Sequence, residues 1–349
     1  MRLSVIVPVY NGASGGTLVH CLDSLLSQTI PKSDYEVIAI DDASTDDTLS
    51  LLRDYEKREG GNLRVLHSEV NLRQGGAKNM GLGIARGEWI SFIDADDWVR
   101  TDFYEKLLTL ADERGADVCG CDLTRVTEYT TRVAERIPNH TKEQEGVLDD
   151  EKKRSLVLDA GALVVNIYKR HVVYGEEEGK EHPEVFPEHM FYEDNAAGSS
   201  FMMRATCFAY LPEAMYFYYQ HEDSTTHTVT YERLRDRLRA ARILLERSKE
   251  NGALARFREE IEYKYTRLFY INTLFSAMQQ KKLPGVYAFT RGVAREMKET
   301  FPDFEKNPYY EREVHPEEKK LIAMQMRSHF LFYVYYRALH AYRSVRYGK

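Results

Sequence analysis

Apolar and polar residues alternate along the chain in two ways, which divides the sequence into parts. In the first 125 residues, short apolar runs alternate with segments of helical period, a pattern typical of βαβ units and a mostly parallel sheet. The apolar runs predict strands over 3–9, 36–41, 63–68, 88–94 and 116–123. The segments between them predict helices over 18–27, 46–58, 76–85 and 103–113.

The pattern changes twice after this part. Residues 127–159 are polar and rich in charge, which indicates an excursion or a flexible loop, and apolar runs return at 162–169, 201–211 and 214–221. From Tyr231 onward the apolar spacing is helical. Gly252 is expected to separate two helices, and Pro284-Gly285 to start a new unit.

Three of the predicted strands end in unusual loops. The first ends in "PVYNG", the second in "DDASTDD" and the fourth in "DADDW". In open α/β sheets, the loops that leave the carboxyl ends of the strands form the ligand crevice. These three loops are therefore the first place to look for a site.

In the second of these loops, most of the acids have a structural explanation. Ser44 is expected to cap the next helix, with Asp47 as its capping-box partner, and Asp46 would favour the positive end of the helix dipole. This explanation does not cover Asp41 and Asp42, which sit at the strand mouth where an acid can bind a base or a ribose.

The stretch "FIDADDW" places three aspartates within four positions after an apolar run. Strand alternation would put Asp94 and Asp96 on one face, where a pair of oxygen ligands favours Mg²⁺ or Mn²⁺ with phosphate oxygens completing the shell. Asp97 would point the other way and serve the loop or the acceptor side. The alternative is an ordinary exposed turn, in which aspartates are common.

Further along the chain, Glu193 and Asp194 lie between aromatic and apolar residues. An apolar wall raises a carboxyl pKa toward working pH, which suits a general base, but the two acids also fit the first turn of a helix. His221, on an aromatic run, is a secondary candidate for a phosphate or metal contact. The glycines of 75–87 match neither the dinucleotide fingerprint nor the P-loop, which argues against a dehydrogenase or a P-loop enzyme.

Composition limits the remaining possibilities. The 349 residues carry a net charge of −7, with 43% hydrophobic residues, as in an ordinary globular chain. Residues 319–349 hold seven Lys or Arg and no acid, so the rest carries −7 − 7 = −14, and no nucleic-acid partner is indicated. Four cysteines without zinc spacing suggest buried thiols in a reducing compartment. No signal peptide and no long apolar run is visible, which predicts a cytoplasmic protein that does not span a membrane.

Several motifs together resemble the family 2 glycosyltransferases, the inverting enzymes with the GT-A fold. These motifs are "SVIVPVYNG", "IDDASTDDT" and "AKNMGLGIARGEWISFIDADDW", followed by "VNIYKR", "FYEDN" and "YFYYQHEDS". The resemblance implies a GT-A catalytic domain over 1–228, with a nucleotide-sugar-binding half (1–125) and an acceptor-binding half (126–228). A C-terminal helical region (229–349) would follow.

The resemblance also implies roles for single residues. Pro8, Val9 and Tyr10 would line the nucleotide pocket, and Asp42, more than Asp41, would meet the base. Asp94 and Asp96 would form the DXD motif that holds ribose and a metal-bound diphosphate, with Mn²⁺ or Mg²⁺ as cofactor, and Asp194 would be the base, with Glu193 as a secondary candidate. Lys78 would also bind the nucleotide sugar. Lys78 and His221 stand where the family often has arginine, which leaves their phosphate contacts open.

The function implied is transfer of a sugar from a nucleoside-diphosphate sugar, commonly a uridine diphosphate sugar, to a hydroxyl of a glycan or lipid-linked acceptor. A sugar-nucleotide nucleotidyltransferase would need a basic glycine-rich loop after the first strand, and "YNGASGGT" has no Lys or Arg. A non-catalytic binding scaffold is a third alternative. The basic aromatic tail (319–349) is expected either to lie on the inner face of an anionic membrane or to pack as a helix on the body or on a second subunit, so homo-oligomers stay open.

Overall fold

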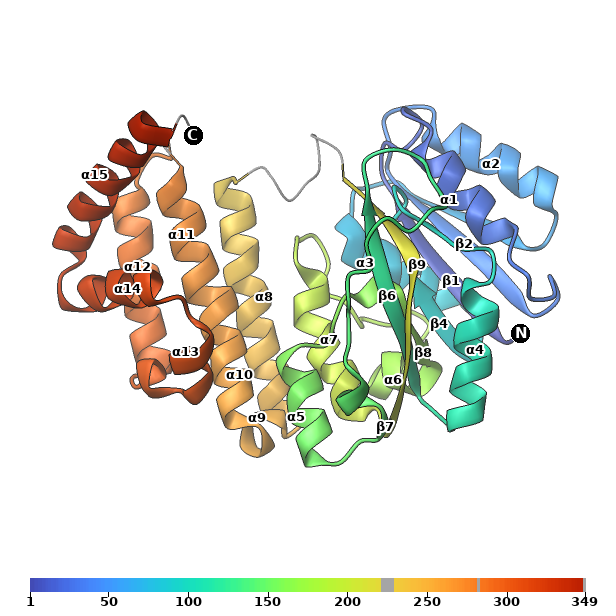
Figure 1. Ribbon diagram of the computed structural model, residues 1–349. Coiled ribbons are helices and arrows are strands. Elements are labelled where there is room, and N and C mark those ends of the chain that lie inside the picture. Colours follow the sequence, from blue (N-terminus) through green and yellow to red (C-terminus); the bar gives the residue numbers. More distant parts are fainter. Residues whose placement is uncertain (221–228, 281–282, 348–349) are drawn as a thin grey trace. The chain divides into compact units, whose positions relative to one another are not determined.

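The computed structural model describes residues 1–220, 229–280 and 283–347. Clustering of contacts divides the chain into two compact units, Met1–Ser224 and Thr225–Lys349 (Figure 1). The first unit mixes strands and helices, whereas the described part of the second is helical.

The first unit follows the predicted strand–helix alternation up to the fifth apolar run. Its first part contains β1 (Leu3–Val9), α1 (Thr17–Leu26), β2 (Tyr35–Asp42), α2 (Thr48–Glu59), β3 (Leu63–Ser68), α3 (Arg73–Ile84), β4 (Trp89–Phe92), β5 (Trp98–Val99), α4 (Phe103–Arg114) and β6 (Val118–Val126). Its second part contains β7 (Gly146–Val147), α5 (Asp150–Leu158), β8 (Asn166–Lys169), α6 (Arg170–Tyr174), α7 (Glu193–Arg204) and β9 (Cys207–Tyr219).

The strands form one sheet in the order β3-β2-β1-β4-β8-β6-β9-β5, and β7 pairs with β9. The strands β3, β2, β1 and β4 run parallel, as predicted. Among the described strands beyond β4, β6 and β9 pair in parallel, and the pairings of β8, β5 and β7 are antiparallel. The expectation of a mostly parallel sheet is therefore confirmed, because the long pairings of β1 with β2, β2 with β3 and β6 with β9 are parallel, whereas the antiparallel pairings, such as that of β8 beside β4, are short.

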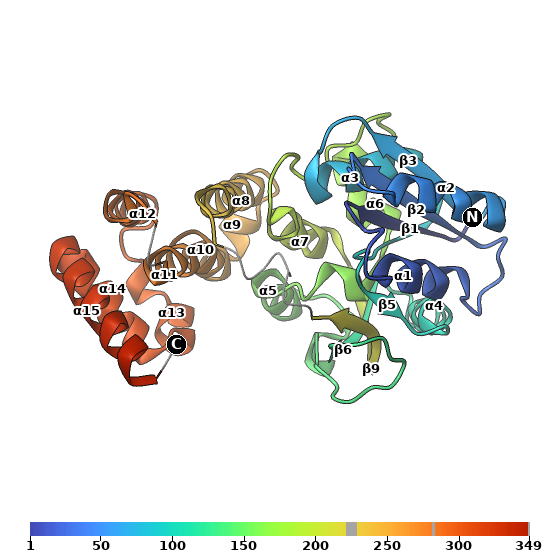
Figure 2. The same cartoon turned by 90° about the horizontal axis from the view of Figure 1, so that it is seen from above.

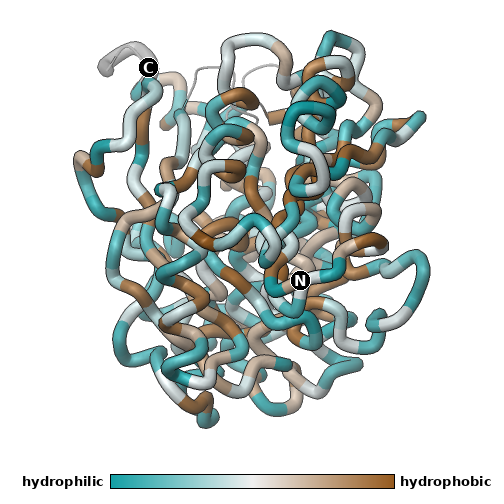
Figure 3. Tube along the Cα trace, turned by 90° about the vertical axis from the view of Figure 1, so that its right-hand side faces the viewer, coloured by the Kyte–Doolittle hydropathy of each residue, from teal (hydrophilic) through white to brown (hydrophobic). Residues whose placement is uncertain are grey.

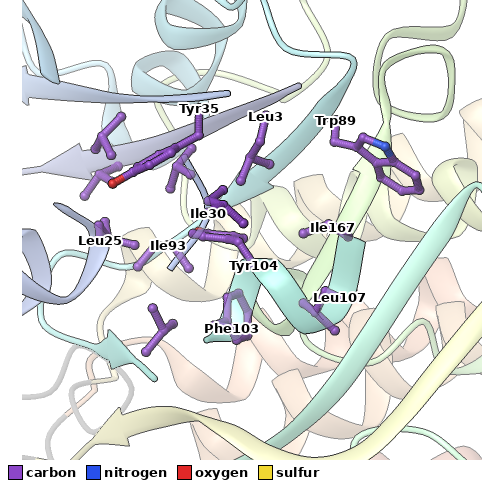
Figure 4. Close-up of a cluster of buried hydrophobic side chains, with 14 of the residues drawn as sticks. Leu3, Leu25, Ile30, Tyr35, Trp89, Ile93, Phe103, Tyr104, Leu107 and Ile167 are labelled. Carbon is purple, nitrogen blue, oxygen red and sulfur yellow. The ribbon is translucent and has the colours of Figure 1, made fainter. Parts of the chain in front are cut away.

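Two apolar cores cover the two faces of this sheet, so the unit has three layers (Figure 2). The strand β1 shows how they arise, since Val5 and Val7 belong to the core with α1, α2 and α4, while Ile6 belongs to the core with α3, α5, α6 and α7. Figure 4 shows part of the first core, where Phe103, Tyr104 and Leu107 of α4 lie beneath the strands. Burial on both faces explains why the parallel strands read as continuous apolar runs.

Two segments of the first unit differ from the sequence prediction. The polar stretch 127–159 holds a helix, α5, that was not predicted. The apolar run 201–211 is the end of α7 followed by the start of β9, because a buried helix end and a buried strand give the same apolar pattern over such a length.

The second unit is built from α8 (Tyr231–Glu250), α9 (Ala253–Arg256), α10 (Arg258–Tyr265), a π-helical stretch (Thr266–Ile271), α11 (Asn272–Gln279), α12 (Val286–Thr300), α13 (Pro308–Glu313), α14 (Pro316–Arg327) and α15 (His329–Tyr347). Gly252 adopts φ 78° between α8 and α9, and Gly285 precedes α12 with φ 71°, as the glycine signals predicted. Hydrophilic and hydrophobic residues alternate at short intervals along the chain on the side that faces the viewer in Figure 3.

All four cysteines are free and buried, as expected, and Cys119 and Cys121 face the same core. Within the described ranges, no helix combines the length and the apolar character needed to cross a membrane.

Candidate active site

Three loops meet along one edge of the parallel half of the sheet. The strand β1 lies between β2 and β4, with Val9 opposite Asp41 and Ile6 opposite Phe92. The segments after Val9, Asp42 and Phe92 therefore leave the sheet side by side. This is the edge of the sheet at which the sequence pattern predicted a ligand crevice.

At the end of β1, the residues predicted to line a nucleotide pocket differ in exposure. Pro8 and Val9 are buried inside the strand, so only their backbone could meet a ligand, whereas the Tyr10 ring is 51% exposed. The loop that follows is tied to the next one, because the Asn11 N–H donates to Ser44 Oγ at 2.9 Å and the Thr45 N–H to Asn11 Oδ1 at 2.8 Å.

These contacts correct the capping-box prediction. The helix α2 begins at Thr48 with Asp47 as its N-cap residue, and Asp47 makes no side-chain cap bond. Ser44 is used by the neighbouring loop instead, because the β1 and β2 ends lie side by side. Asp46 does accept the Thr48 N–H at 3.1 Å, at the positive end of the helix, as expected.

Asp41 and Asp42 point to opposite faces of β2. Asp41 shares the face of Ala39 and is buried, with Oδ2 2.7 Å from Nδ1 of His67. Asp42 shares the face of Ile40, toward α3, and its Oδ1 accepts the Leu72 N–H at 2.7 Å. Burial raises the pKa of Asp42. Only Asp42 thus lies on the α3 side of the sheet.

The aspartates after β4 lie in a turn, not in a strand. The strand ends at Phe92, and the Asp97 N–H donates to the Asp94 carbonyl at 3.1 Å. The alternation used to place Asp94 and Asp96 on one face therefore does not apply, although both side chains are half-buried at the edge. A turn is also what the alternative interpretation, an ordinary exposed turn, predicted. The residues around Asp94 and Asp96 therefore decide between a ligand site and a plain turn.

Those residues show a concentration of charge around Asp94. Burial raises the pKa of Asp94 to about 7, with Lys78 acting in the opposite direction and the carboxylates of Asp96, Glu193 and Asp194 adding to the rise. Residues far apart in sequence therefore share one electrostatic neighbourhood. A cation bound there would be stabilised by the carboxylates.

Asp97 points away from this neighbourhood. Its side chain is buried and anchors β9, since Oδ2 accepts from the Tyr216 hydroxyl at 2.5 Å and Oδ1 accepts from the Tyr219 N–H at 2.8 Å. Asp97 thus serves the loop, and the suggestion that it meets the acceptor side is not supported. The role of Tyr216 was missed, and an aromatic run alone carries no signal for it.

Lys78 and Glu193 form an ion pair inside the protein. The Lys78 Nζ lies 2.6 Å from Glu193 Oε1, with side-chain exposures of 3% and 6%. Burial alone would lower the pKa of Lys78, but the charge of Glu193, with those of Asp94 and Asp194, outweighs it and the pKa is raised. Lys78, expected at the nucleotide sugar, is therefore held by Glu193 within the fold.

Asp194 differs from its neighbour. The helix α7 begins at Glu193, so both acids lie in its first turn, as the helix-start interpretation predicted. Glu193 is buried, whereas Asp194 is exposed and accepts hydrogen bonds from the Asn195 backbone and side-chain amides at 2.8 Å. Of the two, only Asp194 is accessible to a substrate.

The start of α7 is positioned by α3. Asn79 binds the backbone of Phe186 on both sides, donating to its carbonyl at 2.8 Å and accepting from its N–H at 2.9 Å. The His189 N–H donates to the Leu72 carbonyl at 2.9 Å. The sequence analysis missed Asn79, since one buried amide in a helix has no sequence signature.

A glycine allows this close packing. A Cβ at Gly75 would lie 2.1 Å from the Pro187 carbonyl oxygen and 3.3 Å from Glu193 Cβ. Gly75 and Gly76 both lie in the first turns of α3, so the segment packed against this helix explains the glycine at position 75.

We predict that Gly75→Ala destabilises the protein by about 1–3 kcal/mol, because the added methyl group meets backbone that cannot rotate away. The free energy of unfolding in urea measures this. Gly292→Ala in α12 is the matched control, since a Cβ there meets no atom within 4 Å, and it should stabilise by about 0.5–1 kcal/mol. Equal effects in the two variants would contradict the close approach.

The remaining candidate, His221, lies outside the described residues. Within the described residues, no group of three or more His, Cys, Asp or Glu side chains is arranged to hold a metal ion. A cation at Asp94 and Asp96 would need ligands from a substrate or from water.

Comparison with known proteins shows which family and which relatives this chain resembles. The model of the family described as "Glycosyl transferase family 2" matches residues 4–194. A poly(ribitol-phosphate) beta-glucosyltransferase of Bacillus spizizenii is 40% identical over 119 residues, which are 34% of this chain and 18% of that protein. An uncharacterized glycosyltransferase of Escherichia coli, YibD, is 29% identical over 229 residues, or 64% of this chain and 63% of that one. The matched part thus spans less than two thirds of either relative.

Among solved structures, Staphylococcus aureus TarS 1–349 in complex with UDP-GlcNAc aligns with a TM-score of 0.70 at 22% identity, covering 100% of this chain and 93% of that chain. The likeness supports the GT-A fold inferred from the sequence motifs. Because the family model spans more than half of the 349 residues and includes the edge with Asp42, Asp94, Asp96 and Asp194, the chain belongs to glycosyl transferase family 2.

Proposed function

We propose that this chain is an inverting glycosyltransferase that moves a sugar from a nucleoside-diphosphate sugar to a hydroxyl group of a glycan or lipid-linked acceptor. One observation carries the proposal: the accessible carboxylate of Asp194 lies in the electrostatic neighbourhood of Asp94, at the edge where three strand-end loops meet. Relatives named for sugar transfer support it.

In this proposal the donor lies along the edge. Tyr10 offers an exposed ring to the base. Asp42, on the α3 side of β2, accepts the Leu72 N–H and would also accept a hydrogen bond from the base. Asp94 and Asp96 face the ribose and the diphosphate. Uridine diphosphate is the expected nucleotide, since a protein of the same fold is known in complex with UDP-GlcNAc.

The reaction is a single displacement. The acceptor oxygen forms a bond to the anomeric carbon as the bond to the diphosphate breaks, so the configuration inverts. An acceptor hydroxyl has too high a pKa to attack unaided, and Asp194 takes its proton as general base. The Lys78–Glu193 pair touches neither reactant and is a positioning element, because Glu193 fixes the residue before Asp194.

The carboxylates of Asp94 and Asp96 suit a divalent cation that arrives with the donor. Mg²⁺ and Mn²⁺ bind through one or two carboxylates and complete their shell with water and phosphate oxygens, so two acids suffice. Such an ion would offset the negative charge on the departing diphosphate. Burial raises the pKa of Asp94 to about 7, and a cation bound beside it would favour its ionised form.

A thermal-shift panel tests donor and cation together. We expect UDP and UDP-GlcNAc to raise the melting temperature more with Mn²⁺ than without it, because the ligand binds only the folded state. Asp96→Ala should remove the Mn²⁺-dependent part of the shift. Asp54→Ala, an exposed acid of α2, is the control and should change nothing.

The panel separates the two parts of the proposal. If a nucleotide raises the melting temperature equally with and without Mn²⁺, the proposed cation site is wrong and the proposed donor still stands. If no nucleotide or nucleotide sugar stabilises the protein under either condition, the donor assignment fails.

We also propose that the reaction takes place in the cytoplasm, which four free, buried thiols support. Contact of residues 319–349 with an anionic membrane stays a prediction from the sequence.

A further inference from the structure

The chain reaches Asp194 through a segment whose backbone is unusual. Residues 186–192 form neither helix nor strand, and α7 begins at Glu193. Within this segment His189 and Tyr192 adopt φ angles of 54° and 67°, and Tyr192 directly precedes α7. A left-handed backbone is unfavourable for residues other than glycine and persists only where the surroundings fix it. The position of Asp194 therefore depends on what holds residues 186–192.

The start of α3 holds the middle of this segment. The Leu72 carbonyl accepts the His189 N–H at 2.9 Å, and the Arg73 guanidinium carbon lies 4.5 Å from the centroid of the Phe191 ring. Leu72 also donates its own N–H to Asp42 Oδ1 at 2.7 Å. The same residue thus contacts Asp42 on one side and the segment before α7 on the other.

Asn79, in the second turn of α3, holds the beginning of the segment. Its Nδ2 donates to the Phe186 carbonyl at 2.8 Å and to Glu188 Oε1 at 3.0 Å, and its Oδ1 accepts the Phe186 N–H at 2.9 Å. Asn79 is only 4% exposed, so bulk water does not compete for these bonds. The amide therefore fixes both polar backbone groups of Phe186 and sets the orientation of the backbone that follows.

The Phe186 side chain connects this support to two parts of the candidate site. Its ring centroid lies 5.2 Å from that of Phe92, the last residue of β4 before the aspartate turn, and 5.9 Å from that of Phe201 in α7. Phe186 is buried between these rings. The residue that Asn79 holds by its backbone is thus packed against both the strand of the aspartate turn and the helix of Asp194.

We infer that Asn79 is a positioning residue for Asp194, acting through the backbone of residues 186–192. The inference rests on the proposed function, in which Asp194 is the general base. A base must lie within hydrogen-bond reach of the proton that it takes, and a displacement of about 1 Å can lower a rate about 10²-fold. Asn79 keeps Asp194 at that distance because it fixes the path of the chain into α7.

Steady-state kinetics of Asn79→Ala test this role, with UDP-GlcNAc as the donor probe and poly(ribitol phosphate), the polymer named for two relatives, as the acceptor probe. We expect kcat to fall at least about tenfold and the KM for UDP-GlcNAc to change less than about twofold, because the base moves and the donor contacts stay. Asn79→Asp loses the donor to the Phe186 carbonyl and should show the same split between kcat and KM.

Asn62→Ala is the matched control for a general loss of stability. The Asn62 side chain also binds backbone, donating to the Lys32 and Tyr35 carbonyls at 2.7 and 3.0 Å. It directly precedes β3, at the amino ends of the parallel strands and away from the candidate site. This variant should leave kcat unchanged at a temperature where all variants are folded.

A double variant isolates the path of the effect. If Asn79 acts through the base, adding Asn79→Ala to Asp194→Asn should lower kcat by less than about a further twofold, because no base is left to position. A further loss as large as that in the otherwise native chain would show that Asn79 acts independently of Asp194, and the inference would be overturned.

Amide hydrogen exchange tests the support without any substrate. In Asn79→Ala the amides of residues 186–192 and of the first turn of α7 should exchange faster than in the native chain, whereas those of β3 should not. Unchanged exchange in residues 186–192 would also overturn the inference. Failure of the proposed function is seen separately, as full activity of Asp194→Asn in a chain whose residues 186–192 still respond to Asn79→Ala.

Discussion

Asp194→Asn is expected to lower the rate of sugar transfer by about 10²–10⁴-fold while the donor binds as before, because general-base catalysis contributes about that much. Asparagine has nearly the same shape as aspartate but cannot accept the proton of the acceptor hydroxyl. Release of nucleoside diphosphate in the presence of acceptor measures the rate, and the thermal shift by UDP measures donor binding.

A control separates the base from a helix-start effect. Asp150→Asn removes an acid from the first turn of α5, also at an exposed position, and should cost about 0.3–1 kcal/mol at most with no loss of rate. Full activity in Asp194→Asn would remove Asp194 from the mechanism and leave it as the first-turn acid that the sequence also allowed.

Breaking the Lys78–Glu193 pair is expected to destabilise the protein by about 3–5 kcal/mol, since either single change leaves an unpaired charge among buried groups. Lys78→Met and Glu193→Gln should both show this in urea unfolding. The double variant Lys78→Met/Glu193→Leu should cost less than the sum of the single changes, because it removes both members of the pair together.

The exposed pair Lys57–Asp54 provides the comparison, with side-chain exposures of 77% and 71%. Lys57→Met should change the free energy of unfolding by about 0–1 kcal/mol, because solvent screens the charges. If Lys78→Met changes the free energy of unfolding as little as Lys57→Met does, the buried pair does not fix Lys78. The expected role of Lys78 at the nucleotide sugar would then be the better explanation.

The sequence predicted much of the first half of the sheet. The strands around Val5, Ile38 and Val65 and the helices packed on them fall within a few residues of their predicted bounds. Each of these elements has an apolar pattern, continuous in the strands and of helical spacing in the helices, that depends only on its own residues. The helix α5 and the antiparallel pairing of β8 with β4 lacked such a local signal. Whether a polar segment forms a helix, and which strand pairs with which, depends on the residues that pack against them.

The candidate site shows the same division. The residue types at the strand ends, including Asp42, Asp94 and Asp96, follow from the order of apolar runs, because a parallel sheet gathers its carboxyl ends at one edge. Resemblance to a family then pointed to Asp194. Neither the order of apolar runs nor the family resemblance predicted that Ser44 binds the β1 loop. They also did not predict that the "DADDW" aspartates lie in a turn after the strand.

What the sequence by itself determined is the strand–helix order of the first 125 residues, the edge where a ligand would lie and the family. What only the tertiary structure decided is how neighbouring acids are divided: Asp97 is anchored to β9, Glu193 is paired with Lys78, and Asp194 is exposed. The physical reason is that the fate of a carboxylate depends on burial and on partners more than 100 residues away, as between Lys78 and Glu193, and these contacts arise only when the fold closes.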